Sequence, residues 1–264
     1  MTASPFPRPR TAPAAHPTRR PGAPRALPVL VLGVLLLLPS PAAPAPPRPL
    51  VRLAAESRVC LVGERHRSPA GHRMFGDLVS ELAAGGRPVA VGLEIPADRQ
   101  GLLDRAVGDG QIPDGLVPPV IDSPSYRRML AGLLWLGRQG PVRLWALDAP
   151  GGPGADRDAF MARRVLEALD SGADRVVVLV GNLHVLAVPA DRLGGRLRAA
   201  GIPAGRVLTD ASGDEGGAGP GTWLPSSAPR AVAAVQQLWS LLRRPPGGAA
   251  GDAVHGLVLW PGGA

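Results

Sequence analysis

Residues 59–66 read VCLVGERH and residues 176–184 read VVVLVGNLH, so a Gly-x-x-His motif follows an apolar run twice in this chain. A short run of Val and Leu without polar alternation is typical of a strand buried on both faces, as in a parallel sheet. His66 and His184 are therefore expected at the carboxyl ends of two strands. Ligands bind at that edge of an open parallel sheet, because the loops of neighbouring strands converge there. The two motifs thus predict the class of fold and the place of the site together.

The rest of the chain alternates apolar runs with amphipathic helical patterns, separated by clusters of Gly and Pro. This alternation predicts an α/β fold, with a single domain built on a mostly parallel central sheet flanked by helices. Strands are predicted over 58–62, 88–93, 142–147, 175–180, 206–209 and 254–260. Helices are predicted near 71–84, 97–107, 125–138, 156–169, 191–200 and 228–242. Loops are predicted over 151–155, 212–221 and 245–251.

The first 42 residues have the features of an export signal. Five arginines and no acidic residue precede the apolar stretch 27–38, and small residues near Ala42 provide a cleavage site. The apolar stretch is shorter than the roughly 20 residues that span a bilayer, which favours a cleaved signal over the alternative of a retained anchor. We therefore predict a signal peptide over 1–42, a Pro-rich linker over 43–57 and the α/β domain over 58–264. The protein is expected to be exported, periplasmic or extracellular, without stable membrane insertion after cleavage.

The charge of the chain does not indicate a nucleic-acid partner. The formal net charge is +8, and the five arginines of the predicted signal account for more than half of it. All 29 basic residues are arginine, which indicates a compositional bias more than a basic binding surface. The single cysteine, Cys60, lies inside the first predicted strand and is expected to pack in the core.

Polar side chains follow four successive predicted strands. Glu64 and His66 follow the first strand, Glu94 the second, Asp148 the third and His184 the fourth. For Asp148 alone, a helix cap or a solvated turn is the simpler interpretation. The other four side chains combine imidazole and carboxylate groups, which are the components of a metal site or an acid/base site.

These residues also carry a family resemblance. Gly63 to His66, Ser68 to His72, and Glu94 followed by Gln100 resemble the start of the ChaN-type domains of haem uptake. That superfamily also holds the Tiki metalloproteases, and erythromycin-esterase-like hydrolases are similar in fold and motif. The later landmarks follow in order over residues 58–201, namely Tyr126, Arg157-Asp158, and Gly181 to His184 with Val188-Pro189 behind it.

The Tiki resemblance implies a metal-dependent hydrolase of a peptide, amide or ester bond, with a small molecule or a peptide as substrate. Glu64, His66, Glu94 and His184 would then be metal ligands or catalytic groups, and Zn, Mn, Fe or Co suits such donors. Arg157 would stabilise an oxyanion or bind a substrate carboxylate. Without a metal, the same residues allow esterase-like chemistry in which a histidine activates water directly. The sequence leaves both options open.

The ChaN resemblance implies a second function, that of a non-catalytic haem-binding protein. Histidine and tyrosine are axial ligands of haem iron. The candidates for cofactor binding are His72 and Tyr126, with His66 as a further ligand. Against haem, aromatic residues make up only 3% of the chain, so few rings are present to pack a porphyrin.

Overall fold

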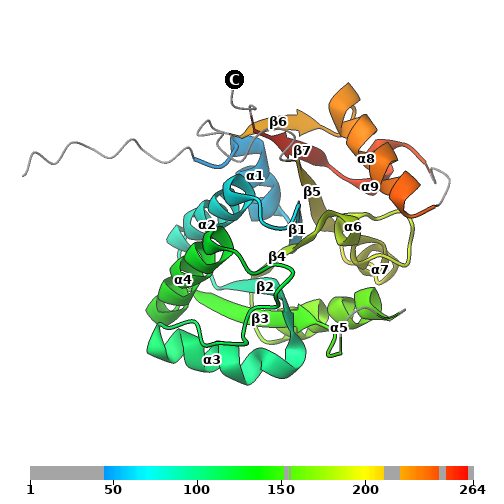
Figure 1. Cartoon of the computed structure of the whole chain (residues 1–264). Helices are drawn as coiled ribbons and strands as arrows, with labels where there is room; N and C mark the ends of the chain where they lie inside the picture. Colours follow the sequence, from blue (N-terminus) through cyan, green and yellow to red (C-terminus); the bar gives the residue numbers. More distant parts are fainter. Residues whose placement is uncertain (1–44, 152–153, 155, 211–220, 244–247, 261–264) are drawn as a thin grey trace, which may run out of the picture. The chain divides into compact units, whose positions relative to one another are not determined.

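The computed structural model describes residues 45–151, 154, 156–210, 221–243 and 248–260, and the predicted signal peptide over 1–42 lies outside them. Strands and helices alternate along the described chain, as predicted (Figure 1). The strands are β1 (Val59–Glu64), β2 (Val89–Pro96), β3 (Val142–Asp148), β4 (Arg175–Gly181), β5 (Ala204–Asp210), β6 (Thr222–Pro225) and β7 (Gly256–Leu259). The helices are α1 (Arg48–Glu56), α2 (Pro69–Ala84), the 3₁₀ turn η1 (Ala97–Arg99), α3 (Gln100–Asp109), α4 (Pro124–Gln139), α5 (Arg157–Asp170), α6 (Asn182–Val185), α7 (Leu193–Ala199), α8 (Pro229–Leu241) and α9 (Ala250–Ala253).

The described strands form one sheet in the order β3-β2-β4-β1-β5-β7-β6. Every neighbouring pair is parallel except β6 with β7, so the predicted α/β class is confirmed. β1 and β4 are buried at every position, which explains their continuous apolar sequences. Their register pairs Val59 with Val176 and Glu64 with Gly181, so the two Gly-x-x-His motifs leave the sheet side by side.

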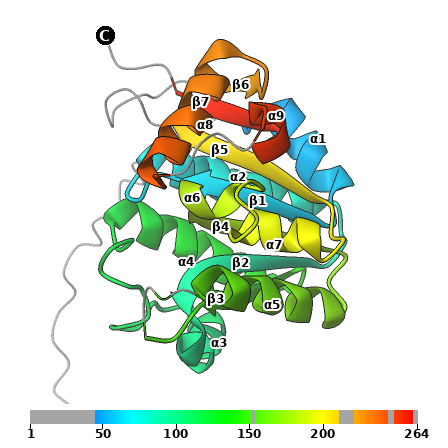
Figure 2. The same ribbon diagram turned by 90° about the vertical axis from the view of Figure 1, so that its right-hand side faces the viewer.

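Helices cover both faces of the sheet (Figures 1 and 2). Helices α1 to α4 pack on one face, and α5, α7, α8 and α9 pack on the other. The chain leaves β1 toward α2 on the first face and leaves β4 toward α6 on the second face. Two adjacent strands whose connections diverge in this way open a crevice at their carboxyl ends.

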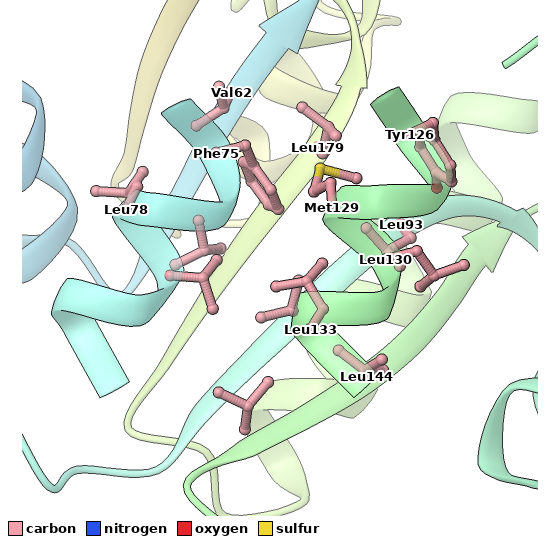
Figure 3. Close-up of a cluster of buried hydrophobic side chains, with 14 of the residues drawn as sticks. Val62, Phe75, Leu78, Leu93, Tyr126, Met129, Leu130, Leu133, Leu144 and Leu179 are labelled. Carbon is pink, nitrogen blue, oxygen red and sulfur yellow. The ribbon is translucent and has the colours of Figure 1, made fainter. Parts of the chain in front are cut away.

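The larger core lies between the sheet and helices α2 and α4 (Figure 3). Phe75 and Leu78 of α2 and Leu130 of α4 are fully buried there against Leu93 of β2 and Leu179 of β4. This packing fixes the starts of α2 and α4, which carry polar groups toward the carboxyl edge of the sheet.

The structure corrects the prediction of a linker over 43–57, because α1 forms within that range. Leu50 and Ala54, one helical turn apart, are fully buried against the core, and Pro49 stands in the first turn, where a helix tolerates proline. Burying a leucine contributes roughly 1.5–3 kcal/mol. The high proline content of this segment favoured the prediction of a linker, whereas α1 is a helix that packs on the domain core.

Three smaller differences separate the predicted elements from those of the structure. The helix predicted near 97–107 is divided into η1 and α3, and the strand predicted over 254–260 begins only at Gly256, after α9. The edge strand β6, which follows directly after the predicted loop over 212–221, was not predicted, because its sequence, TWLP, is too short for a clear periodic signal.

No helix among the described residues is long and apolar enough to cross a membrane.

Candidate functional site

Four strand ends deliver polar side chains to one edge of the sheet, as the sequence predicts. Glu64, Glu94 and Asp148 end or nearly end β1, β2 and β3, and His184 lies in α6 just beyond β4. A pocket of about 560 Å³ opens at this edge. Its polar side is lined by Glu64, Arg65, His66, Glu94, Arg157, Asn182 and His184.

Backbone and side-chain hydrogen bonds join the strand ends around the pocket. The Thr209 hydroxyl of β5 donates to the Gly63 carbonyl at 2.6 Å, and the Asn182 amide group donates to the Thr209 carbonyl at 2.9 Å and accepts from the Thr209 N–H at 3.2 Å. A Cβ on Gly63 would lie 2.3 Å from Asn182 Oδ1. Glycine is therefore required before Glu64 so that α6 can approach β1.

Glu64 is buried between two histidines. Its Oε1 lies 3.1 Å from His66 Nδ1, and its Oε2 lies 2.9 Å from His72 Nε2. Burial by itself would raise the pKa of Glu64, but the two imidazoles outweigh burial and lower it. Glu64 is thus held as a carboxylate at the base of the pocket.

His66 is the exposed member of this group, with 33% of its side chain accessible. The hydrogen bond that His66 donates to Glu64 raises the pKa of His66, an effect that partial burial opposes. Nε2 of His66 has no hydrogen-bond partner among the described residues. It lies close to Gly181 at the pocket wall, where a Cβ added to this glycine would be 3.5 Å away.

A second carboxylate–histidine pair faces the same pocket. Asp158, the second residue of α5, lies 2.7 Å from His184 Nδ1 through its Oδ1, which also accepts the Leu193 N–H at 2.8 Å. Since an ionised carboxylate only accepts, the Nδ1 proton of His184 is assigned to this contact. Nε2 of His184 then faces Arg157 Nη1 at 3.3 Å.

Arg157 opens α5 and lies between two buried carboxylates. Its Nε donates to Asp148 Oδ1 at 2.6 Å, and its Nη2 donates to Asp148 Oδ2 at 2.8 Å and to Glu94 Oε1. The other oxygen of Glu94 accepts the Gly181 N–H at 2.8 Å. Burial alone would lower the pKa of Arg157, but Asp148 and Glu94 raise it above its ordinary value.

The sequence predicts Glu64, His66, Glu94, Arg157 and His184 as site residues, and the structure brings all five to one pocket. It did not assign two buried carboxylates to the site. Asp148, predicted as a cap or turn, is the main partner of Arg157, and Asp158 orients His184. Asp158 directly follows Arg157 in the sequence, so the Arg157-Asp158 pair is the sequence feature that could have indicated Asp158 as a residue of the site.

The predicted metal ligands do not fit a divalent ion in this arrangement. Both oxygens of Glu64 face imidazole nitrogens, and both oxygens of Glu94 accept protein N–H groups. The guanidinium of Arg157 already supplies a positive charge beside Glu94 and His184, and it would repel a second cation. Within the described part of the chain, no three His, Cys, Asp or Glu side chains are grouped as a metal site.

Two of the three predicted haem ligands do not reach the pocket. His72 and Tyr126 are each 1% exposed, and their rings pack edge-to-face with centroids 5.4 Å apart. Nδ1 of His72 contacts Ser125 Oγ at 2.8 Å, so His72 supports Glu64 from inside the protein. Of the three predicted haem ligands, only His66 lines the pocket. No Phe, Tyr or Trp is among the described residues that line it.

The fold is similar to that of several solved structures, whereas no family model matches the sequence and no curated protein matches it. The type III effector HopBA1 aligns with a TM-score of 0.55 and 13% identity over 85% of this chain and all of the effector. ChaN of Campylobacter jejuni, described with cofacially bound haem, aligns with a TM-score of 0.53 and 10% identity over 81% of this chain and 91% of ChaN. A Bacillus cereus protein aligns with a TM-score of 0.55 and 13% identity over 81% of this chain and 90% of its own. The resemblance to ChaN-type domains is thereby confirmed for the fold.

The contact with Glu64 predicts that His66 titrates above 6.5. NMR titration of its ring protons should show this elevated pKa, and Glu64→Gln should lower it. Because the folded-state pKa is the higher one, protonated His66 stabilises the fold fully below the unfolded pKa, and this contribution is lost as the pH rises through the folded pKa. An ordinary pKa that does not respond to Glu64→Gln would contradict the proposed pairing.

Proposed function

We propose that this protein is a hydrolase in which His66 acts as general base toward water, without a metal ion. One observation carries the proposal: Glu64 holds Nδ1 of His66, while Nε2 of the same ring faces the pocket without a hydrogen-bond partner among the described residues. A carboxylate that fixes the tautomer and orientation of an imidazole is the usual arrangement for histidine base catalysis. Of the two options left open by the sequence, the arrangement favours direct activation of water, because Arg157 lies where the predicted metal would bind.

The proposed reaction is attack of water on the carbonyl carbon of an ester or amide. Nε2 of His66 takes one proton of the water as the oxygen bonds to the carbonyl carbon. The tetrahedral intermediate then collapses, the bond to the leaving group breaks, and protonated His66 returns the proton to that leaving group. The products are an acid and an alcohol or amine, and the histidine is restored.

Arg157 is the group we assign to the developing oxyanion. Its contacts with Asp148, Glu94 and His184 use four of the five guanidinium N–H donors, which leaves one N–H on Nη1. A fixed donor that points to the place where negative charge develops lowers the barrier without reorganisation. Glu94, Asp148 and the Asp158–His184 pair are positioning residues, because they act by holding this guanidinium.

The proposal predicts that His66→Asn lowers hydrolysis by roughly 10²–10⁴-fold, the usual contribution of a general base. The assay is turnover of a panel of ester and amide substrates by the purified chain, in the presence of a chelator. His255→Ala is the matched control, since His255 lies outside the pocket and accepts a hydrogen bond from the Arg206 N–H. Equal turnover in the parent and in His66→Asn would refute the proposed base.

Haem binding is the second candidate function. It is supported by the fold shared with ChaN of Campylobacter jejuni and by the exposure of His66 in an open pocket. Haem added to the purified chain should then give a Soret band that His66→Ala removes and Glu94→Gln preserves, since Glu94 has no role in holding iron. Absence of a Soret shift in the parent would rule out this candidate.

We further propose that residues 1–42 are a cleaved signal and that the protein acts outside the cytoplasm. Cleavage near Ala42 leaves α1 complete, and this helix contributes Leu50 and Ala54 to the core. N-terminal sequencing of the exported protein should show a chain that begins near Ala43. Recovery of the full-length chain from membranes would support a retained anchor instead.

A further inference from the structure

Helix α8 carries two apolar stripes. Ala231, Val235 and Trp239 recur every four residues and are buried against the sheet. Ala234, Leu238 and Leu241 form a second stripe, which faces the site pocket. Ala234 and Leu238 are partly buried and also pack against the core, whereas Leu241 remains exposed at the end of this stripe.

The pocket is divided into a polar end and an apolar wall. We define the apolar wall as Leu208, Ala234, Leu238, Leu241 and Leu257. Leu208 of β5 and Leu257 of β7 are neighbours in register and form its floor, while α8 forms its side. The members of the wall are aliphatic, although Gln237 of α8 also lines the pocket, and the polar end holds His66 and Arg157.

Leu241 is the most exposed part of this wall, with 65% of its surface accessible. A single exposed leucine is common on protein surfaces. Leu241 differs because it lines the same pocket as the candidate catalytic groups and belongs to a stripe with Ala234 and Leu238. A pocket of about 560 Å³ in which an apolar wall adjoins a group of convergent polar side chains is suited to a small molecule.

We propose that the apolar wall receives the aliphatic acyl group of the substrate, whose carbonyl carbon lies between His66 and Arg157. This inference rests on the proposed hydrolase function and names its substrate class as uncharged esters or amides of aliphatic acids. Acyl methylenes buried against the wall would strengthen binding by up to about fourfold each. Polar or charged acyl groups would lose solvation there without gaining a partner.

The test compares kcat/KM for p-nitrophenyl hexanoate and p-nitrophenyl acetate. We expect hexanoate to be preferred by at least about tenfold, and Leu241→Gln to reduce this preference by about fivefold through loss of apolar contact. Trp135→Gln is the matched control, because Trp135 is a large apolar side chain that is also exposed (61%) and lies on α4 outside this pocket. An equal rate for the two esters in the parent, or an unchanged preference in Leu241→Gln, would overturn the proposal while leaving hydrolysis intact.

Calorimetric titration with hexanoate and acetate ions measures binding to the proposed acyl site independently of ester hydrolysis. Hexanoate should bind at least about tenfold more tightly than acetate, and Leu241→Gln should diminish the difference. Such binding without turnover of either ester would support the acyl site and reject the hydrolase. If neither acid distinguishes the parent from Leu241→Gln, the acyl site is rejected. If Leu241→Gln instead converts a dimer into a monomer and leaves ester preference unchanged, the wall is a subunit interface and the proposal fails.

Discussion

The parallel pairing of β1 with β4 is the constraint on which the site depends. Although more than a hundred residues separate them in sequence, the two strands are neighbours, and their register sets Glu64 beside Gly181. Both are buried along their whole length, so a slip in register would expose or misplace the polar residues that follow them. The close approach of α6 to Gly63 then fixes where His184 and Asn182 stand relative to Glu64.

Charge compensation is the second requirement at this edge of the sheet. Glu64, Glu94, Asp148 and Asp158 are all nearly buried, and a buried carboxylate is costly unless it is paired or accepts hydrogen bonds. Arg157 compensates Glu94 and Asp148, and the histidines compensate Glu64 and Asp158. The arginine and the imidazoles therefore contribute to stability, because removal of one partner leaves a buried charge without compensation.

The same network distinguishes the candidate functions. The guanidinium of Arg157 supplies a positive charge between Glu94 and His184, and the proposal of His66 as the base relies on this arrangement. The apolar wall at the other end of the pocket gives the site an amphipathic character. The proposed substrate, a carbonyl compound with an aliphatic substituent, would contact both ends, whereas a porphyrin would find His66 and His184 but no Phe, Tyr or Trp among the described residues of the pocket.

The sequence alone determined the α/β class, most strands and the position of Glu64, His66, Glu94 and His184 at one edge of the sheet, because apolar runs and strand-end motifs are local signals. The tertiary structure decided which groups meet: helix geometry turns His72 inward to Glu64 and Ser125, and the start of α5 sets Arg157 against Asp148. The tertiary structure also decided that residues 48–56 form a helix and that the second apolar stripe of α8 lines the pocket. These features depend on pairing between distant segments and on which face of each helix the core covers, and neither is encoded in the spacing of nearby residues.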